Sequence, residues 1–178
     1  STPLQHKLTI AEGLTGNQIA EILAEKGWCS KEDFLNVIRS SEFIAQMGLK
    51  KIQHLEGYLF PDTYYFTKIP KLSAEEIAEM MVTRFLQVWE QLGAEEAARH
   101  KTVILASIVE KETAAPEERP LVAAVFLNRL KKGMRLQSDP TVIYGIDDFS
   151  GDLTRKDLRN PTPYNTYIIS GLPAGPIA

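Results

Sequence analysis

Two glutamates stand two residues apart in the run from Val103 to Thr113, which ends shortly before Pro116. The run contains no glycine or proline and is predicted to be a helix. Each residue of a helix turns about 100° around the axis, so that with Ile104 at 0° Glu112 lies at roughly 80° and Glu110 at roughly 240°. The apolar stripe is centred near roughly 70° and is formed by Ile104, Leu105, Ile108 and Val109. We therefore expect Glu112 among core-facing side chains and Glu110 in water.

The expected position of Glu112 suggests acid chemistry. A carboxyl group in an apolar wall either pairs with a cation or keeps its proton, because desolvation disfavours the charged form. A carboxyl group that keeps its proton at working pH can donate it to a leaving group. The alternative is a structural glutamate bonded to a neighbouring backbone group or arginine, and the helix alone favours neither interpretation.

The composition limits the classes of function. The chain has 178 residues, 44% of them hydrophobic, and a formal net charge of -3, which gives no electrostatic footprint for nucleic acid. Cys29 is the only cysteine, and the histidines form no metal-binding pattern, so neither a metal nor a cofactor is expected. No run approaches the 18 apolar residues typical of a membrane-spanning helix.

Residues 1–54 are predicted to form a small α/β leading segment. Residues 7–12 alternate as a short strand. Thr15 is predicted to cap a helix that closes at Gly27, and Ser30 to cap the next one.

Residues 55–178 are expected to carry the active site. Residues 55–66 crowd five aromatic rings around Gly57 and Pro61, which predicts a bent, extended segment containing Glu56 and Tyr58. This segment is either an aromatic mini-core or one wall of a sugar-binding cleft, and the sequence favours both equally.

A helical hairpin is predicted around Glu112. Ser73 begins a long helix that ends at Gly93, and the helix of Glu112 follows it. A further helix restarts at Pro116 and continues to Gly133, so that it forms the hairpin with the helix of Glu112. The inward positions predicted for the restarted helix are Leu121, Val122, Val125, Phe126 and Leu130. The fold class is therefore α+β and helix-rich, with a helical active-site region and with short strands and long loops lining a cleft.

Two loop regions are rich in amides, hydroxyls and rings. They are residues 135–145 and 160–167, and a Pro- and Gly-rich end follows from Gly171. Such loops suit a polyhydroxyl ligand, which needs many neutral hydrogen bonds and flat apolar faces. The alternative is that they are well-tied surface loops.

The helix and the loops together resemble the endolytic murein transglycosylases of the MltG/YceG-like family. The resemblance rests on Ala106–Thr113, Leu136–Gly145, Pro163–Tyr167 with the Gly-Leu-Pro that follows at 171, and Leu55–Tyr64. It extends from about Leu8 to the end of the chain. It implies a lytic-transglycosylase-like active-site region.

The activity implied by this resemblance is non-hydrolytic cleavage of peptidoglycan strands between N-acetylmuramic acid and N-acetylglucosamine. The catalytic glutamate of the family matches Glu112. It would first protonate the glycosidic oxygen and then deprotonate the C6 hydroxyl of the muramic acid, giving a 1,6-anhydro end. The candidate substrate-binding residues are Gln137, Ser138, Asp139, Tyr144, Tyr164, Asn165, Thr166, Glu56 and Tyr58.

The resemblance also implies a location and partners. Family members usually carry an N-terminal membrane-spanning helix and a small LysM-like region before this part of the chain, and further residues after it. We therefore expect a protein of the cell envelope, anchored in the inner membrane with its catalytic domain outside the cytoplasm. The expected partners are peptidoglycan strands and penicillin-binding cell-wall synthases.

Two rival functions stay open at this point. One is a non-catalytic peptidoglycan-binding module associated with cell-wall synthases. The other follows from the label aminodeoxychorismate lyase, a pyridoxal-phosphate enzyme, which some family members have carried. That chemistry needs a Schiff-base lysine and a phosphate cup, and the sequence offers neither a Gly-rich cup nor a lysine in an apolar setting.

Overall fold

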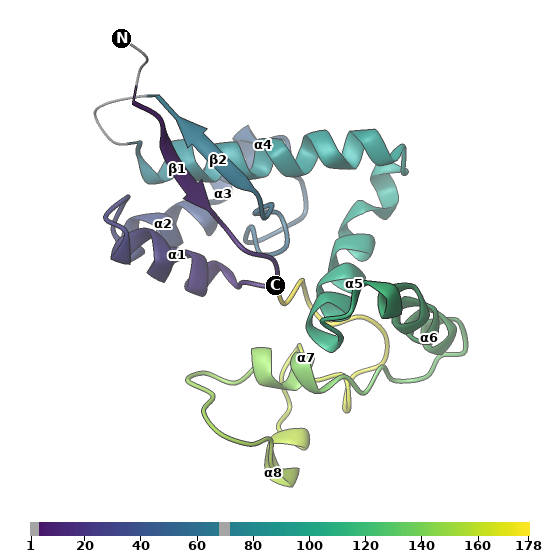
Figure 1. Ribbon diagram of the computed structural model, residues 1–178. Coiled ribbons are helices and arrows are strands. Elements are labelled where there is room, and N and C mark those ends of the chain that lie inside the picture. The colour runs from purple at the N-terminus through teal and green to yellow at the C-terminus, as the bar shows by residue number, and fades with distance from the viewer. Residues whose placement is uncertain (1–3, 68–71) are drawn as a thin grey trace. The chain divides into compact units, whose positions relative to one another are not determined.

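The computed structural model describes residues 4–67 and 72–178, and the chain divides into two compact units (Figure 1). Unit 1 covers Ser1–Ala94 and unit 2 covers Glu95–Ala178. The chain is α+β and helix-rich, as predicted, and its described sheet has two strands. Residues 55–94, which were expected with the active-site portion, lie in the same unit as the leading segment.

The sheet belongs to unit 1. Strand β1, His6–Thr9, pairs antiparallel with β2, Thr63–Phe66, so that His6 lies opposite Phe66 and Thr9 opposite Thr63. The strand predicted over 7–12 therefore begins one residue earlier and stops at Thr9. The aromatic segment is extended and bent, as predicted, and its last four residues provide β2.

Four helices complete unit 1. They are α1 (Gly16–Glu25), α2 (Lys31–Ile38), α3 (Ser41–Gln46) and α4 (Ala74–Leu92). The predicted capping boxes at Thr15 and Ser73 are both confirmed, and the side chain of Ser30 caps α2. Helix α2 packs against both α1 and α4.

Glu56 and Tyr58 have structural contacts in unit 1. The buried carboxylate of Glu56 accepts a hydrogen bond of 2.7 Å from the backbone N–H of Gly16, at the start of α1. An anion is favoured there because the first N–H groups of a helix have no partner within it. Tyr58 is 1% exposed and packs edge-on against Phe85. These contacts agree with the aromatic mini-core, and Tyr58 offers no open ring face to a sugar in this conformation.

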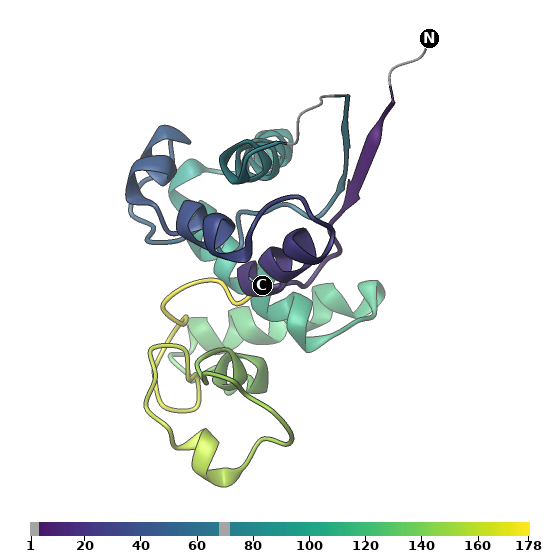
Figure 2. The same cartoon turned by 90° about the vertical axis from the view of Figure 1, so that its left-hand side faces the viewer.

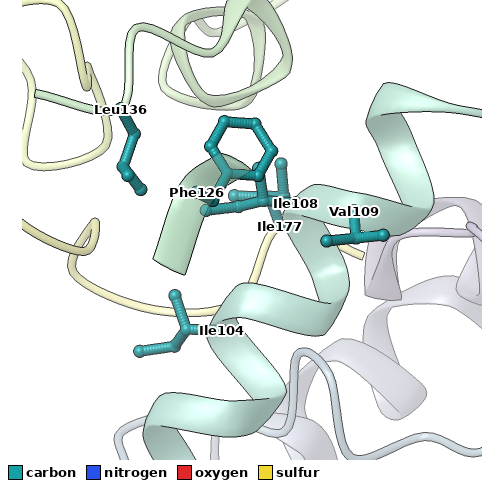
Figure 3. Packing of buried hydrophobic residues seen from close by; sticks show 6 residues of the cluster. All are labelled: Ile104, Ile108, Val109, Phe126, Leu136 and Ile177. Carbon is teal, nitrogen blue, oxygen red and sulfur yellow. The ribbon is translucent and has the colours of Figure 1, made fainter. Parts of the chain in front are cut away.

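Unit 2 is built on the predicted helical hairpin. Helix α5, Arg99–Glu112, packs against α6, Arg119–Lys131, and short 3-10 turns precede both. Two further helices, α7 (Asp139–Tyr144) and α8 (Arg155–Leu158), are short. Figure 3 shows the apolar cluster of this unit, formed by Ile104, Ile108, Val109, Phe126, Leu136 and Ile177.

The inner face of α6 is narrower than predicted. Phe126 is buried, and Val122 and Leu130 pack partly against the cluster. Leu121 and Val125 were predicted to point inward, but they are 70% and 45% exposed. The three inward residues are spaced by four, which gives the narrow stripe of a helix that packs mainly against one neighbour.

The C-terminal segment returns to α5 (Figures 1 and 2). The backbone N–H of Ile177 donates to Ser107 Oγ at 3.0 Å, and this hydroxyl donates to the Ile104 carbonyl at 2.7 Å. The last residues therefore belong to the core of unit 2. Within residues 4–67 and 72–178, no helix combines the length and the apolar character needed to cross a bilayer.

We predict that Glu56→Gln destabilises the protein by about 1–2 kcal/mol, because the hydrogen bond loses its charged acceptor in a buried place. The measurement is chemical denaturation followed by circular dichroism. Glu79→Gln, on the exposed side of α4, is the matched control and should shift the free energy of unfolding by less than about 0.5 kcal/mol. An unchanged stability of Glu56→Gln would favour the ligand-binding role instead.

Candidate active site

Glu112 is the last residue of α5, and its side chain is exposed. The predicted burial in an apolar wall is therefore wrong. The buried residues of α5 are Val103, Ile104, Ser107, Ile108 and Val109. Their directions average about -20° on the same wheel, roughly 90° away from the predicted stripe. Glu112 consequently points past the edge of the core.

The prediction for Glu110 is also wrong. Its side chain is 28% exposed and forms an ion pair of 3.2 Å with Arg119 of α6. The rotation of the buried face has a local cause at Ser107. That hydroxyl is buried without loss of hydrogen bonding, because it bonds the Ile104 carbonyl and the Ile177 N–H. Ser107, a polar residue outside the predicted apolar stripe, thus lies on the inner face.

Ser138 makes the direct contact with Glu112. Its hydroxyl donates to Glu112 Oε2 at 3.0 Å, and Ser138 is 1% exposed. The contact joins the end of α5 to the loop before α7, 26 residues further along the chain. A hydrogen bond to a carboxylate fixes the plane of that group. Oε2 is therefore held by the protein at a position that solvent can reach.

Two buried threonines hold Ser138 in place, and we call Ser138, Thr141 and Thr166 the hydroxyl cluster. The N–H of Ser138 donates to Thr166 Oγ1 at 2.9 Å, and its carbonyl accepts from Thr141 Oγ1 at 2.6 Å. The threonine hydroxyls are 2.7 Å apart, and both residues are fully buried. Both backbone groups of Ser138 are therefore engaged.

The direction of each proton in the hydroxyl cluster follows from these contacts. Thr141 has a single hydroxyl proton, and the Ser138 carbonyl can only accept, so Thr141 donates to it. Thr166 must then donate to Thr141 Oγ1, since that atom has no second proton to give. The hydroxyl of Ser138 takes no part in these contacts and donates its proton to Glu112.

A second carboxylate follows directly in sequence. Asp139 is exposed, and its Oδ1 accepts a hydrogen bond of 2.5 Å from the hydroxyl of Tyr167. This bond raises the pKa of Tyr167 to about 12, and burial and the negative charges of Asp139 and Glu112 act in the same direction. Arg129 partly opposes them. The phenol therefore keeps its proton at neutral pH and lies within the electrostatic field of Glu112.

The side chains of Arg129 and Arg135 hold the two loops by donating to backbone carbonyls of those loops. Arg129 Nη1 donates to the Leu136 carbonyl at 2.6 Å, and Arg135 Nη1 donates to the Tyr167 carbonyl at 3.2 Å.

Within the described residues no cluster of three or more His, Cys, Asp or Glu side chains could hold a metal ion.

The other predicted loop residues have different surroundings. Gln137 is exposed, has a positive φ of 52°, and donates its N–H to the Thr166 carbonyl. Tyr144 and Tyr164 pack edge to face, 4.7 Å between ring centres, beside the apolar cluster. Asn165 is fully buried and ties its loop together through the carbonyls of Leu158 and Asn160 and the N–H of Tyr167. Asn165 and Thr166 thus lie behind the surface that a ligand would reach.

A groove of about 540 Å³ lies between α5 and α6, away from these contacts. Its walls are mainly apolar and are formed by Thr102, Leu105, Ala106, Val109, Glu110, Pro116, Arg119, Pro120 and Ala123. It lies on the Glu110 side of α5 and does not include Glu112, Ser138 or Asp139.

The structure brings together Glu112, Ser138, Asp139 and Thr166 from the predicted set, while Glu56 and Tyr58 belong to unit 1. Sequence reasoning missed Thr141 and Tyr167 as site residues. Both lie inside the loop motifs, so the motifs were a signal for them, but their roles depend on pairing across 25 and 28 residues. The result is an accessible, oriented carboxyl group beside a second carboxylate, which suits acid–base chemistry on a large ligand.

Comparison with known proteins finds named relatives of this chain. The chain is 35% identical to a protein of Bacillus subtilis strain 168 named endolytic murein transglycosylase, over all of this chain and 54% of that protein. It is 32% identical to a Streptococcus pneumoniae R6 protein of the same name, over 98% of this chain and 36% of that one. The chain thus spans about half or less of these relatives.

A solved structure supports the fold. The crystal structure of a YceG-like protein from Listeria monocytogenes matches 97% of this chain and 62% of its own, with a TM-score of 0.83 and 40% identity. The model of the YceG-like family matches residues 1–178. Because this match spans the whole sequence, the chain belongs to the YceG-like family.

Proposed function

We propose that this chain carries the catalytic part of an endolytic peptidoglycan transglycosylase, with Glu112 as general acid and then general base. The observation that carries the proposal is the Ser138–Glu112 hydrogen bond, which orients one carboxyl group at an accessible helix end. The names of the bacterial relatives support the substrate, since they describe murein as the polymer acted on.

The first step breaks the glycosidic bond. Protonated Glu112 donates its proton to the oxygen between C1 of N-acetylmuramic acid and the following N-acetylglucosamine, and the C1–O bond breaks with its electron pair on that oxygen. The positive charge that develops at C1 is stabilised by the 2-acetamido group. Ser138 occupies Glu112 Oε2 as a donor, so Oε1 is the oxygen that exchanges the proton.

The second step closes a ring. The C6 hydroxyl oxygen of the same muramic acid attacks C1, and its proton passes to the Glu112 carboxylate. The product ends in 1,6-anhydro-N-acetylmuramic acid, and Glu112 regains the proton that it gave away. One carboxyl group therefore suffices, whereas glycoside hydrolases usually use two.

Sugar binding is assigned to the exposed side of the loops. Gln137 and Asp139 are exposed and lie on either side of Ser138, so they can offer polar groups to sugar hydroxyls. Tyr144 and Tyr164 contribute ring edges beside the apolar cluster. The proposal places this unit outside the cytoplasm, where peptidoglycan lies. The membrane anchor and the cell-wall synthase partners stay predictions for the whole protein.

The products give the first test. Purified sacculi incubated with the protein should release fragments whose muramic acid ends are lighter by one water than reducing ends. Because the proposed cleavage is endolytic, anhydro ends should appear on fragments of several disaccharides. The measurement is chromatography with mass spectrometry. Reducing ends alone would mean hydrolysis, and binding without any release would favour the non-catalytic peptidoglycan-binding module.

Glu112→Gln should remove this activity and leave the fold intact. Loss of a general acid costs about 10²–10⁴-fold in rate, while an exposed side chain changes stability by less than about 0.5 kcal/mol. Glu110→Gln is the matched control on the same helix, and its rate should stay close to that of the original protein. Equal losses of rate in both variants would contradict the assignment of Glu112.

Ser138→Ala should lower kcat and change KM little, because the Ser138 hydroxyl contacts Glu112 and is itself buried. Removal of one orienting hydrogen bond of about 1–2 kcal/mol corresponds to a loss of roughly 5- to 30-fold. Initial rates on soluble glycan strands measure this separation. A rise in KM with unchanged kcat would instead assign Ser138 to sugar binding.

A further inference from the structure

We infer that Tyr167 determines the outcome of the reaction: its hydroxyl engages Asp139 and so prevents this second carboxylate from activating water. The inference rests on the proposed function of Glu112. It concerns a residue that touches Asp139 rather than the reacting atoms, so Tyr167 is a positioning residue.

Ser138, which contacts Glu112, is the immediate neighbour of Asp139 in the chain. Ser138 reaches Glu112 with its hydroxyl, and the next residue, Asp139, receives the hydroxyl of Tyr167. Asp139 is exposed, so water reaches it. An acid with a second carboxylate nearby is the equipment that a glycoside hydrolase uses, with the second group as base or nucleophile. Something in the site must therefore keep Asp139 from that role if the anhydro product is to form.

Tyr167 is built to make this contact. Its hydroxyl lies 2.5 Å from Asp139 Oδ1, the short distance of a hydrogen bond to a carboxylate. Its N–H donates to Asn165 Oδ1 at 3.0 Å and its carbonyl accepts from Arg135 at 3.2 Å, so the backbone on both sides of the ring is held. An oxygen that already accepts a short hydrogen bond has one lone pair fewer for a proton of water.

The phenol stays a donor under working conditions. The pKa of Tyr167 is raised to about 12, first of all by its hydrogen bond to Asp139. It is therefore protonated over the whole neutral range, and the contact does not switch off near pH 7.

Without the phenol hydroxyl of Tyr167, attack by water competes with attack by the C6 hydroxyl in the second step. The glycosidic oxygen still receives its proton from Glu112. A water oxygen then attacks C1, one water proton passes to Asp139, and the product carries a hydroxyl at C1 of a reducing N-acetylmuramic acid. No oxidation state changes, the proton on Asp139 is released to solvent, and Glu112 takes up a proton from solvent for the next cycle. This route competes with attack by the C6 hydroxyl, so the two products report the partition directly.

The test is Tyr167→Phe incubated with sacculi in water enriched in ¹⁸O. The ratio of reducing to anhydro ends should rise by about tenfold or more, since a released general base contributes at least about 10²-fold to the step that it serves. The reducing ends should carry ¹⁸O. The double variant Tyr167→Phe/Asp139→Asn should return to anhydro ends alone. Tyr65→Phe is the control, because it removes a phenol hydroxyl from an exposed position in unit 1.

Each other outcome has a definite meaning. Reducing ends as the main product of the original protein would overturn the proposed function itself. Anhydro ends from the original protein, together with anhydro ends alone or no product from folded Tyr167→Phe, would overturn the role of Tyr167. If Tyr167→Phe does not fold by circular dichroism, the single variant Asp139→Asn decides. Its products must still end in anhydro sugars at whatever rate, and their loss would contradict the inference.

Discussion

Two buried threonine hydroxyls satisfy each other and the backbone of Ser138, and the geometry around Glu112 depends on this constraint. A buried hydroxyl without a partner costs about 1–3 kcal/mol, so Ser138, Thr141 and Thr166 have little freedom to rearrange. The threonine hydroxyls engage the backbone of Ser138, and the Ser138 hydroxyl, which is outside their network, is the remaining donor. That donor faces Glu112. Buried groups that solvent does not reach therefore determine the orientation of an exposed carboxyl group.

This arrangement separates two requirements that compete in an active site. A polymer needs an open approach to the acid, whereas a fixed acid needs contacts that restrict its motion. Here the helix end provides the access and the hydroxyl cluster provides the restriction. Preorganised contacts of this kind lower the reorganisation needed during reaction. The groove between α5 and α6 lies elsewhere and does not include Glu112.

The sequence was informative about elements with strong local signals. Capping boxes at Thr15 and Ser73 and the hairpin of α5 and α6 were predicted correctly, because capping and helical periodicity are properties of neighbouring residues. The burial of Glu112 was predicted wrongly, because the rotation of α5 depends on Ser107 and its bond to Ile177, 70 residues away. The roles of Thr141 and Tyr167 also depend on distant partners. Local patterns placed Glu112 near the end of a helix but did not reveal the groups that contact it.

The same interlocking has a consequence for how this fold can change over time. The segment Ser138–Gly145, which contains α7, and the loop at residues 160–167 meet at the hydroxyl cluster, and they meet again where a side chain at Gly145 would collide with Thr162 Oγ1. A substitution accepted in one segment therefore has to be compatible with the other segment, which is distant in the sequence. Substitutions that change the specificity therefore have to be matched between the two segments. The two segments evolve as one unit although they are separate in the sequence.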